Sequence, residues 1–214
     1  GPGMVGRGGG SRHAGKGVGC LECHRAEKGD ADAFEHGGAL IATVVTPRDC
    51  GGCHRKKNGE FQPSHHAKAG NILASLDNYL AEVVEGARVP FEPHAGKGQV
   101  NGLASVQQGC MQCHGSRVAL AARDGGGVTV DDLKPGADGK PTSAAAVERL
   151  AREADGRPVL AAGTWPNTGI GRLNLDGSLG SRTACHSRHD FSSRPALPPA
   201  SCGQCHPRPA PPQQ

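Results

Sequence analysis

The chain has 214 residues, of which 36% are hydrophobic and 3% aromatic, and it contains 34 Gly and 16 Pro. This composition is too poor in large apolar side chains for an ordinary hydrophobic core, so we expect a large, flat, apolar cofactor to fill the interior. No apolar run reaches the length of a transmembrane helix, so the sequence predicts no membrane-spanning helix.

Residues 1–19 are Gly-rich and basic, and we expect them to form a flexible N-terminal segment. They contain no apolar stretch of the kind that a secretory signal peptide requires.

Four Cys-x-x-Cys-His motifs follow, a pattern typical of covalently attached haem c. The two thiols lie on one side of a helical turn, where they can add to the two vinyl groups along one haem edge. The His that follows binds the iron as proximal ligand. The motifs are Cys20-Leu21-Glu22-Cys23-His24, Cys50-Gly51-Gly52-Cys53-His54, Cys110-Met111-Gln112-Cys113-His114 and Cys202-Gly203-Gln204-Cys205-His206.

Two alternatives exist for such motifs. Paired Cys-x-x-Cys sequences also bind zinc or form disulfides. Neither alternative requires a His directly after every second Cys, and all four motifs have one. We therefore interpret the four motifs as haem sites.

The ninth Cys belongs to an incomplete motif, Arg182-Thr183-Ala184-Cys185-His186, in which Arg182 stands where the first Cys would be. One thioether to Cys185 and an axial His186 would suffice to hold a haem, so a fifth haem is predicted. The alternative is a free buried thiol beside an ordinary histidine.

Six histidines lie outside the motifs, which nearly matches the distal ligands that five bis-His haems would need. The two methionines are weaker alternatives, because Met4 lies in the N-terminal segment and Met111 lies inside its own motif. The distal candidates are His13, His36, His65, His66, His94 and His189.

Spacing separates some of these candidates. His65 and His66 are adjacent and would point in different directions on a helix, so we expect one of them to be a ligand. His189 follows His186 by three residues, one helical turn, and is expected to bind a neighbouring haem.

Position along the chain says less about the other three. His36 lies midway between two motifs, within reach of a haem. His94 is expected in a loop rich in Pro and Gly, so its position fits a surface histidine as well as it fits a haem ligand. His13 lies in the flexible N-terminal segment, where it can reach a haem of this chain or of a neighbouring chain.

Apolar residues at helical spacing predict a helix over residues 66–85, capped by Ser64, and a second over residues 143–155, ended by Gly156. Short helical turns should accompany the haem motifs. No segment alternates clearly enough to predict a sheet.

These elements predict a mostly α fold with extensive coil. We expect residues 20–206 to form a single multihaem cytochrome domain around a chain of closely packed haems, because 214 residues are too few to insulate five haems from one another. Residues 207–214 form a Pro-rich tail.

The formal net charge of +4 says little about partners. Five haems would add about ten propionate carboxylates, which ionise near neutral pH and would reverse its sign. Nucleic-acid binding is therefore not predicted, and redox proteins are the expected partners. Electron transfer between subunits of a homo-oligomer or filament is a further hypothesis, suggested by His13 alone.

Covalent haem is attached outside the cytoplasm, so we expect a periplasmic or extracellular protein. Its signal peptide is then expected to have been removed or to be left out of this sequence.

Three longer segments have distinctive sequences. They are Asp30–Leu80, with Glu35-His36, Thr46-Pro47-Arg48-Asp49-Cys50 and Ser64-His65-His66-Ala67-Lys68-Ala69-Gly70; Thr164-Trp165-Pro166-Asn167-Thr168-Gly169 through Asp176-Gly177-Ser178; and Cys185-His186-Ser187-Arg188-His189-Asp190-Phe191-Ser192. In these segments the chain resembles the hydroxylamine-oxidoreductase-like multihaem cytochromes, and the resemblance covers most of residues 20–208.

The resemblance implies a mostly helical, often trimeric octahaem protein. In that family, one haem with an open iron site oxidises hydroxylamine or hydrazine, or reduces nitrogen oxyanions. By motif order, the resemblance implies that the haem at Cys110 and Cys113 corresponds to this active-site haem, and that His189 is a distal ligand.

This chain differs from the family in three respects. Arg182 replaces a Cys, and the later haem motifs are absent from the sequence. Hydroxylamine-oxidising members carry a Tyr, cross-linked to the active haem, in a C-terminal region absent from this sequence, where the only Tyr is Tyr79.

We therefore predict a multihaem c-type cytochrome that carries electrons by hopping between closely spaced bis-His haems. The alternative is an oxidoreductase of small nitrogen compounds (hydroxylamine, hydrazine or nitrite) at an open haem attached at Cys110 and Cys113, with His94 as one candidate acid or base. A third hypothesis is a non-haem metal-binding module. Electron transfer is favoured, and no catalytic residue is assigned.

Overall fold

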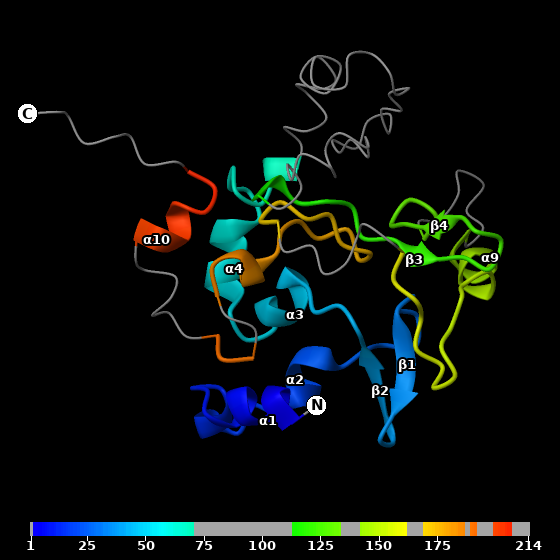
Figure 1. The fold of residues 1–214 in the computed structure, drawn as a ribbon, viewed down its shortest axis with the longest axis horizontal. Helices are drawn as coiled ribbons and strands as arrows, with labels where there is room; N and C mark the ends of the chain where they lie inside the picture. The colour runs from blue at the N-terminus through cyan, green and yellow to red at the C-terminus, as the bar shows by residue number, and fades with distance from the viewer. Residues whose placement is uncertain are drawn as a thin grey trace, which may run out of the picture.

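The computed structural model describes residues 2–70, 113–133, 142–161, 169–186, 189–191 and 199–206. In these residues, short helices and small sheets are joined by long irregular segments (Figure 1). The elements in chain order are α1 (Pro2–Gly9), the 3-10 helix η1 (Ala14–Lys16), α2 (Cys20–His24), β1 (Ala33–His36), β2 (Ala39–Ala42), α3 (Pro47–Gly51), α4 (Arg55–Phe61), β3 (Leu120–Ala121), β4 (Gly127–Val128), α9 (Thr142–Glu148), the 3-10 helix η2 (Arg182–Ala184) and α10 (Pro199–Cys202).

The described residues form two antiparallel, two-stranded sheets, β1–β2 and β3–β4. Gly37 and Gly38 join β1 to β2 with φ values of 59° and 79°, which suit the two-residue turn of a tight hairpin. The expectation that no sheet would form was therefore wrong. Strands of two to four residues are too short to produce a clear alternation in the sequence.

A small apolar core lies beside β3, β4 and α9. Leu120 and Val128, which pair across the β3–β4 sheet, are fully buried, and Leu150 is 3% exposed. Figure 1 shows these elements on one side of the molecule and α2, α3 and α4 towards the other side. The segments that carry the first two haem motifs thus lie outside the centre of this core.

The two predicted helices are confirmed in part. Ser64 Oγ accepts a hydrogen bond from Ala67 N–H at 3.2 Å, as predicted for a cap, and residues 69 and 70 are helical. Residues 71–85 lie outside the described residues.

The second predicted helix, over residues 143–155, is shorter than expected. It is α9, which ends at Glu148. Ala151 N–H instead bonds the Ala121 carbonyl at 2.8 Å, so the chain leaves the helix to pair with β3. Gly156, with φ 82°, lies in the turn that brings Arg152 opposite Pro158.

The N-terminal segment contains α1 and η1, although we expected residues 1–19 to be flexible. Its flexibility stays a prediction. With few helices and two small sheets, the described residues do not establish the mostly α fold. The tail, residues 207–214, lies outside them.

In the described parts of the chain, no helix is both long enough and apolar enough to cross a membrane.

Candidate haem sites

The first motif coincides with helix α2. Cys20 is exposed and Cys23 is half-buried, and both thiols are unpaired. His24 Nδ1 lies 2.8 Å from the Ala42 carbonyl oxygen. A carbonyl oxygen only accepts hydrogen bonds, so Nδ1 carries the hydrogen and Nε2 keeps the lone pair that an iron ligand needs.

The second motif runs from α3 into α4. Thr46 caps α3, because its N–H donates to Asp49 Oδ2 at 2.7 Å and its Oγ1 accepts from Arg48 N–H at 3.2 Å. His54 N–H donates to the Cys50 carbonyl at 2.8 Å, which closes one helical turn over the motif. The ring of His54 is exposed.

Two glycines allow three segments to meet at the third motif. Gly115, directly after His114, has φ 93°. A Cβ on Gly171 would lie 2.6 Å from the His114 carbonyl oxygen and 2.7 Å from Ala69 N, so only Gly fits there. His114 Nδ1 lies 3.1 Å from the Ala69 carbonyl oxygen and, like His24, presents Nε2. Cys110 lies outside the described residues.

The incomplete motif adopts the same turn as the complete ones. His186 N–H donates to the Arg182 carbonyl at 2.9 Å, and His206 N–H donates to the Cys202 carbonyl at 2.8 Å. Burial raises the pKa of Cys185, and nearby Cys202 raises it further. The backbone around Cys185 and His186 is therefore arranged as in a complete motif. The predicted helical turns are confirmed for the described motif segments.

Arg182 occupies the first position of that turn, but its side chain lies against another motif. Its Nη2 donates to Asn58 Oδ1 at 3.3 Å, and its guanidinium carbon lies 5.6 Å from the centre of the Phe61 ring, both in α4. Burial raises the pKa of Cys50, and the charge of Arg182 opposes that rise. The positive charge of Arg182 is therefore placed near the second motif.

Thiols from different motifs lie close together. Burial raises the pKa of Cys23 and of Cys50, with smaller contributions from thiols of the other motif. Burial, followed by a hydrogen bond with Cys113, raises the pKa of Cys205 to about 11. Cys113 Sγ also lies 3.8 Å from the Gln204 carbonyl oxygen. Helix α2 also contacts helix α3, so the first motif adjoins the second, and the third adjoins the fourth.

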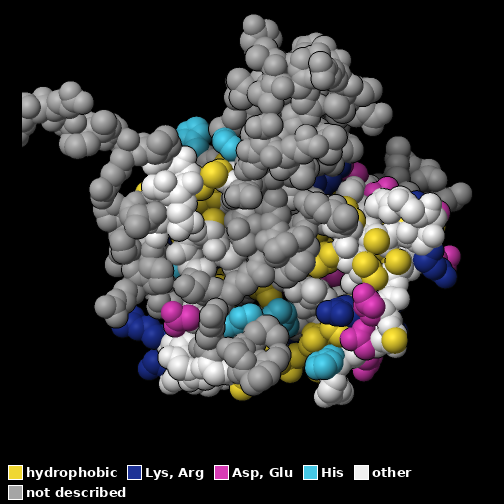
Figure 2. Space-filling model, viewed as in Figure 1, with side chains coloured by type: hydrophobic (Ala, Val, Ile, Leu, Met, Phe, Trp, Pro, Cys, Tyr) yellow, Lys and Arg dark blue, Asp and Glu magenta, His cyan; other side chains and the backbone are white. Residues whose placement is uncertain are grey.

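Two proximal histidines each face a histidine from outside the motifs. The rings of His13 and His54 are 5.9 Å apart between centroids, with 73° between their planes. The rings of His66 and His206 are 6.1 Å apart, with 75° between their planes. Figure 2 shows histidine side chains gathered over the region where α2 and α3 lie in Figure 1.

The remaining distal candidates are His36, His65, His189 and His94. His36, at the end of β1, lies 6.2 Å from the ring of Phe34, and His65 is exposed. His189 has φ 68°, a left-handed backbone conformation. Residues 187 and 188 lie outside the described residues, so its helical spacing from His186 stays a prediction. His94 lies outside the described residues.

Arg117 is a further residue that sequence reasoning missed. It follows His114 by three residues, is 2% exposed, and bonds Asp131 Oδ2 through Nη1 at 2.6 Å. Among the described residues, its Nε and Nη2 are buried without a partner. Buried donors of this kind are rare and costly. Two such donors beside a haem motif could bind a haem propionate. The one sequence signal for this site is that the charged Arg117 directly precedes the apolar residues 118–122.

These observations fit haem as the cofactor of the described motifs. The described cysteines are free thiols on helical turns, the rings of His24 and His114 present Nε2, and the buried guanidinium of Arg117 has, besides its bond to Asp131, two N–H groups without a partner in the described part of the chain. Haem attachment itself stays a prediction.

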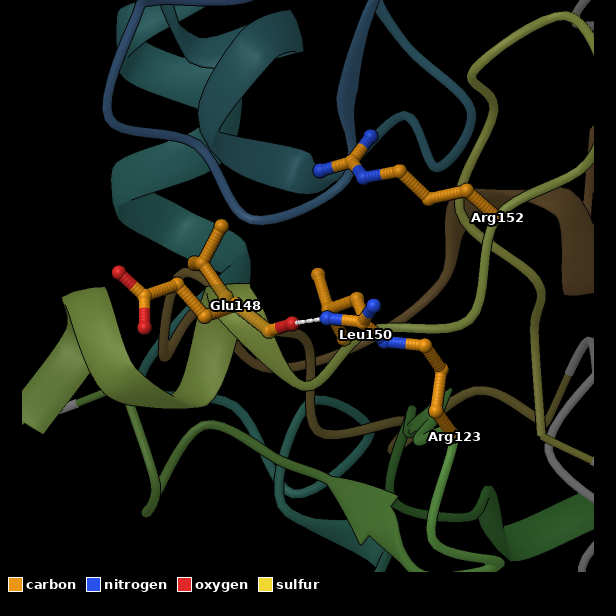
Figure 3. A pocket seen from close by; sticks show the side chains of 5 residues that line it. Arg123, Glu148, Leu150 and Arg152 are labelled. Carbon is orange, nitrogen blue, oxygen red and sulfur yellow. Dashed lines mark hydrogen bonds between the residues drawn. The ribbon is translucent and has the colours of Figure 1, made fainter.

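An open pocket of about 690 Å³ lies beside α9 and is lined by Arg123, Val147, Glu148, Leu150 and Arg152. Arg123 and Arg152 approach it from either side of Leu150, and Arg123 Nη2 donates to the Glu148 carbonyl oxygen (Figure 3). The lining includes no motif residue, so this pocket is separate from the haem sites. Among the described residues, no group of three or more His, Cys, Asp or Glu is arranged to hold a metal ion by itself.

No family model and no curated protein matches this chain. A solved structure described as a hypothetical multiheme protein is similar, with a TM-score of 0.56 and 28% sequence identity over 90% of this chain. This chain covers 32% of that protein and thus spans about a third of its length. The similarity supports a multihaem cytochrome. It does not name the hydroxylamine-oxidoreductase-like family, so that resemblance stays a prediction.

Proposed function

We propose that this chain carries electrons by hopping between closely spaced haems, attached at the four complete motifs and at Cys185. The observation that carries the proposal is the contact between motifs. Cys113 Sγ of the third motif lies 3.8 Å from the Gln204 carbonyl oxygen of the fourth, and helix α2 of the first motif contacts helix α3 of the second. Because each thiol marks one edge of a haem, haems attached there would lie edge to edge, and electrons would pass between them without a diffusing carrier.

The protein supplies binding, orientation and electrostatics. The motif cysteines would hold each haem by thioethers, and the proximal histidines are His24, His54, His114, His186 and His206. The haem supplies the one-electron chemistry when bound. The hydrogen bonds from Nδ1 of His24 and His114 fix the orientation of each ring and make it a stronger donor to the iron.

The intact mass of the holoprotein tests this proposal. The chain would be produced with haem c maturation, outside the cytoplasm, and compared with a Cys185→Ser variant. We expect five haems in the unchanged protein and four in the variant. Equal numbers in both would remove the haem at Cys185, and a colourless protein that retains zinc would overturn the whole proposal.

Catalysis on small nitrogen compounds is a second candidate, at the haem of Cys110 and Cys113. Among the described residues, no histidine ring faces His114 as His13 faces His54. The experiment is to add hydroxylamine or nitrite to the ferric protein. A shift of a high-spin absorption band would favour this candidate, and a purely low-spin, unresponsive spectrum would exclude it.

Covalent haem attachment also places the proposed protein in the periplasm or outside the cell. Its partners would then be redox proteins that meet exposed haem edges, and a homo-oligomer or filament would extend the same path.

A further inference from the structure

The two facing histidine pairs share more than their separation. Each pair joins the proximal His of a motif to a histidine from a distant part of the chain, namely His13 to His54 and His66 to His206. The separations, 5.9 and 6.1 Å, and the interplanar angles, 73° and 75°, are nearly equal in the two pairs.

This separation suits one metal ion bound between two imidazoles. A metal–imidazole bond of about 2 Å, plus about 1.2 Å from the nitrogen to the ring centre on each side, gives about 6.4 Å between centroids. Edge-to-face ring contacts without a metal also occur at such distances. An ordinary ring contact, however, does not explain why both pairs contain a proximal histidine.

We infer that His13 is the sixth ligand of the haem iron at His54, and that His66 is the sixth ligand of the haem iron at His206. The inference rests on the proposed function and deepens it. It assigns both haems to the electron path, because an iron with two axial histidines has no open position for a substrate. It also selects His66 over His65.

The local structure holds His13 in this place. Ser11 Oγ accepts from Ala14 N–H at 3.1 Å, and the His13 carbonyl accepts from Lys16 N–H at 2.9 Å. The ring of Phe191 lies 5.9 Å from that of His13, on a segment far along the chain. His13 therefore lies in a hydrogen-bonded turn that also contacts Phe191.

The turn around His66 is anchored by its neighbours. Ala67 is fully buried and Ala69 is 8% exposed, while His66 is exposed. Ala69 N–H donates to the His66 carbonyl at 3.2 Å. The buried Ala67 and Ala69 hold the backbone of this turn in place, and the exposed ring of His66 faces His206.

The angle between the rings has a spectroscopic consequence. When two axial imidazole planes are parallel, they split the iron d orbitals that point out of the haem plane, whereas near-perpendicular planes leave these orbitals almost equal in energy. Both haems should therefore give low-spin ferric EPR signals of the large-gmax type.

The test uses full-length ferric holoprotein and its His13→Ala, His66→Ala and His65→Ala variants. In each of the first two, we expect one haem equivalent to change from low spin to high spin, with the large-gmax signal reduced and the haem number by mass unchanged. Added imidazole should restore the low-spin signal. His65→Ala is the matched control and should keep the spectrum of the unchanged protein.

Two results would overturn the inference. One is a full haem complement with an unchanged spectrum in His13→Ala and His66→Ala, and the other is the loss of a low-spin haem in His65→Ala. An alanine variant could fail to retain haem. In that case His13→Met and His66→Met keep a ligand at the iron and should show the charge-transfer band of a Met-ligated ferric haem. If a haem-loaded Met variant lacks this band, the inference is also contradicted. An unchanged protein without haem would instead refute the proposed function.

Discussion

Arg182 stands at the first position of the incomplete motif, but its guanidinium contacts Asn58 and Phe61 of α4. Its backbone nevertheless closes the same turn over Cys185 and His186 as a complete motif does. The backbone of Arg182 therefore belongs to the incomplete motif, whereas its side chain packs against the helix that follows the second motif.

Arg182→Cys should complete the motif. If Cys185 holds a haem, we expect the variant to bind the same number of haems but to form a second thioether. Saturation of the second vinyl group shortens the conjugated system, so the α-band of the pyridine haemochrome should move to shorter wavelength. Arg182→Ser is the control and should leave the band in place. An unmoved band in a fully loaded Arg182→Cys protein would show that the new thiol does not reach a vinyl group.

Asp32 is a second residue with a consequence of its own. It is 7% exposed, and its carboxylate accepts from Val44 N–H at 3.0 Å. Burial raises the pKa of Asp32 more than this hydrogen bond lowers it. The folded protein therefore holds this proton more tightly than the unfolded chain, and the stabilising effect of protonation is lost as pH rises from the unfolded value of about 3.9 through the raised pKa.

Asp32→Asn removes this titration and keeps an oxygen that accepts from Val44. We expect the melting temperature of the variant, relative to the unchanged protein, to rise between pH 4 and pH 7, measured by circular dichroism. The exposed Asp155 gives a matched control, Asp155→Asn. A difference for Asp32→Asn that is the same at both pH values would contradict the burial argument.

At the scale of elements, the third motif depends on a close approach of backbones. Gly171 lies against His114 and Ala69, where a Cβ would overlap backbone atoms. The approach also brings the Ala69 carbonyl to His114 Nδ1. The ring of the proximal histidine is therefore oriented by segments that are distant in the sequence.

Gly171→Ala should separate these segments. We expect a loss of about 1–3 kcal/mol in the free energy of unfolding, because backbone atoms must move to admit the methyl group. Gly59, in α4, has open space around it, so Gly59→Ala is the control and should be neutral or stabilising by about 0.5–1 kcal/mol. Urea unfolding measures both variants, and equal stabilities would contradict the close-approach argument.

At the scale of the whole molecule, the motifs form neighbouring pairs. The first and second motifs adjoin where α2 contacts α3, and the third and fourth adjoin where Cys113 Sγ lies 3.8 Å from the Gln204 carbonyl oxygen. The small apolar core lies beside β3, β4 and α9, so the haems themselves would supply much of the remaining apolar interior.

Neighbouring paramagnetic haems should interact magnetically in the fully ferric protein. We expect the integrated low-spin EPR intensity to be lower than the haem number by mass, because close spins couple. A Cys202→Ser/Cys205→Ser variant removes one partner from the pair at Cys113, so it should recover the intensity of the haem at the third motif. One full spin per haem in the unchanged protein would mean that the haems are too far apart for the proposed path.

The residues proposed for haem attachment could be located from the sequence because the chemistry proposed for them is local. Cys20, Cys23 and His24 lie within one helical turn, and α2 forms where the motif predicts it. The Ser64 cap was likewise predictable from its neighbours. The β1–β2 hairpin and the early end of α9 were missed, because pairing between strands of a few residues depends on the partner segment.

The sequence alone was enough to propose where haem would be attached and which histidines would be proximal, because thioether bonds and the first axial bond would be made within five consecutive residues. It also determined how many histidines remain as distal candidates. Only the tertiary structure decided that His13 faces His54, that His66 faces His206, and that Arg182 contacts Asn58 of α4. These relations join segments that are far apart in the chain, and only packing brings such segments within a few ångströms of one another.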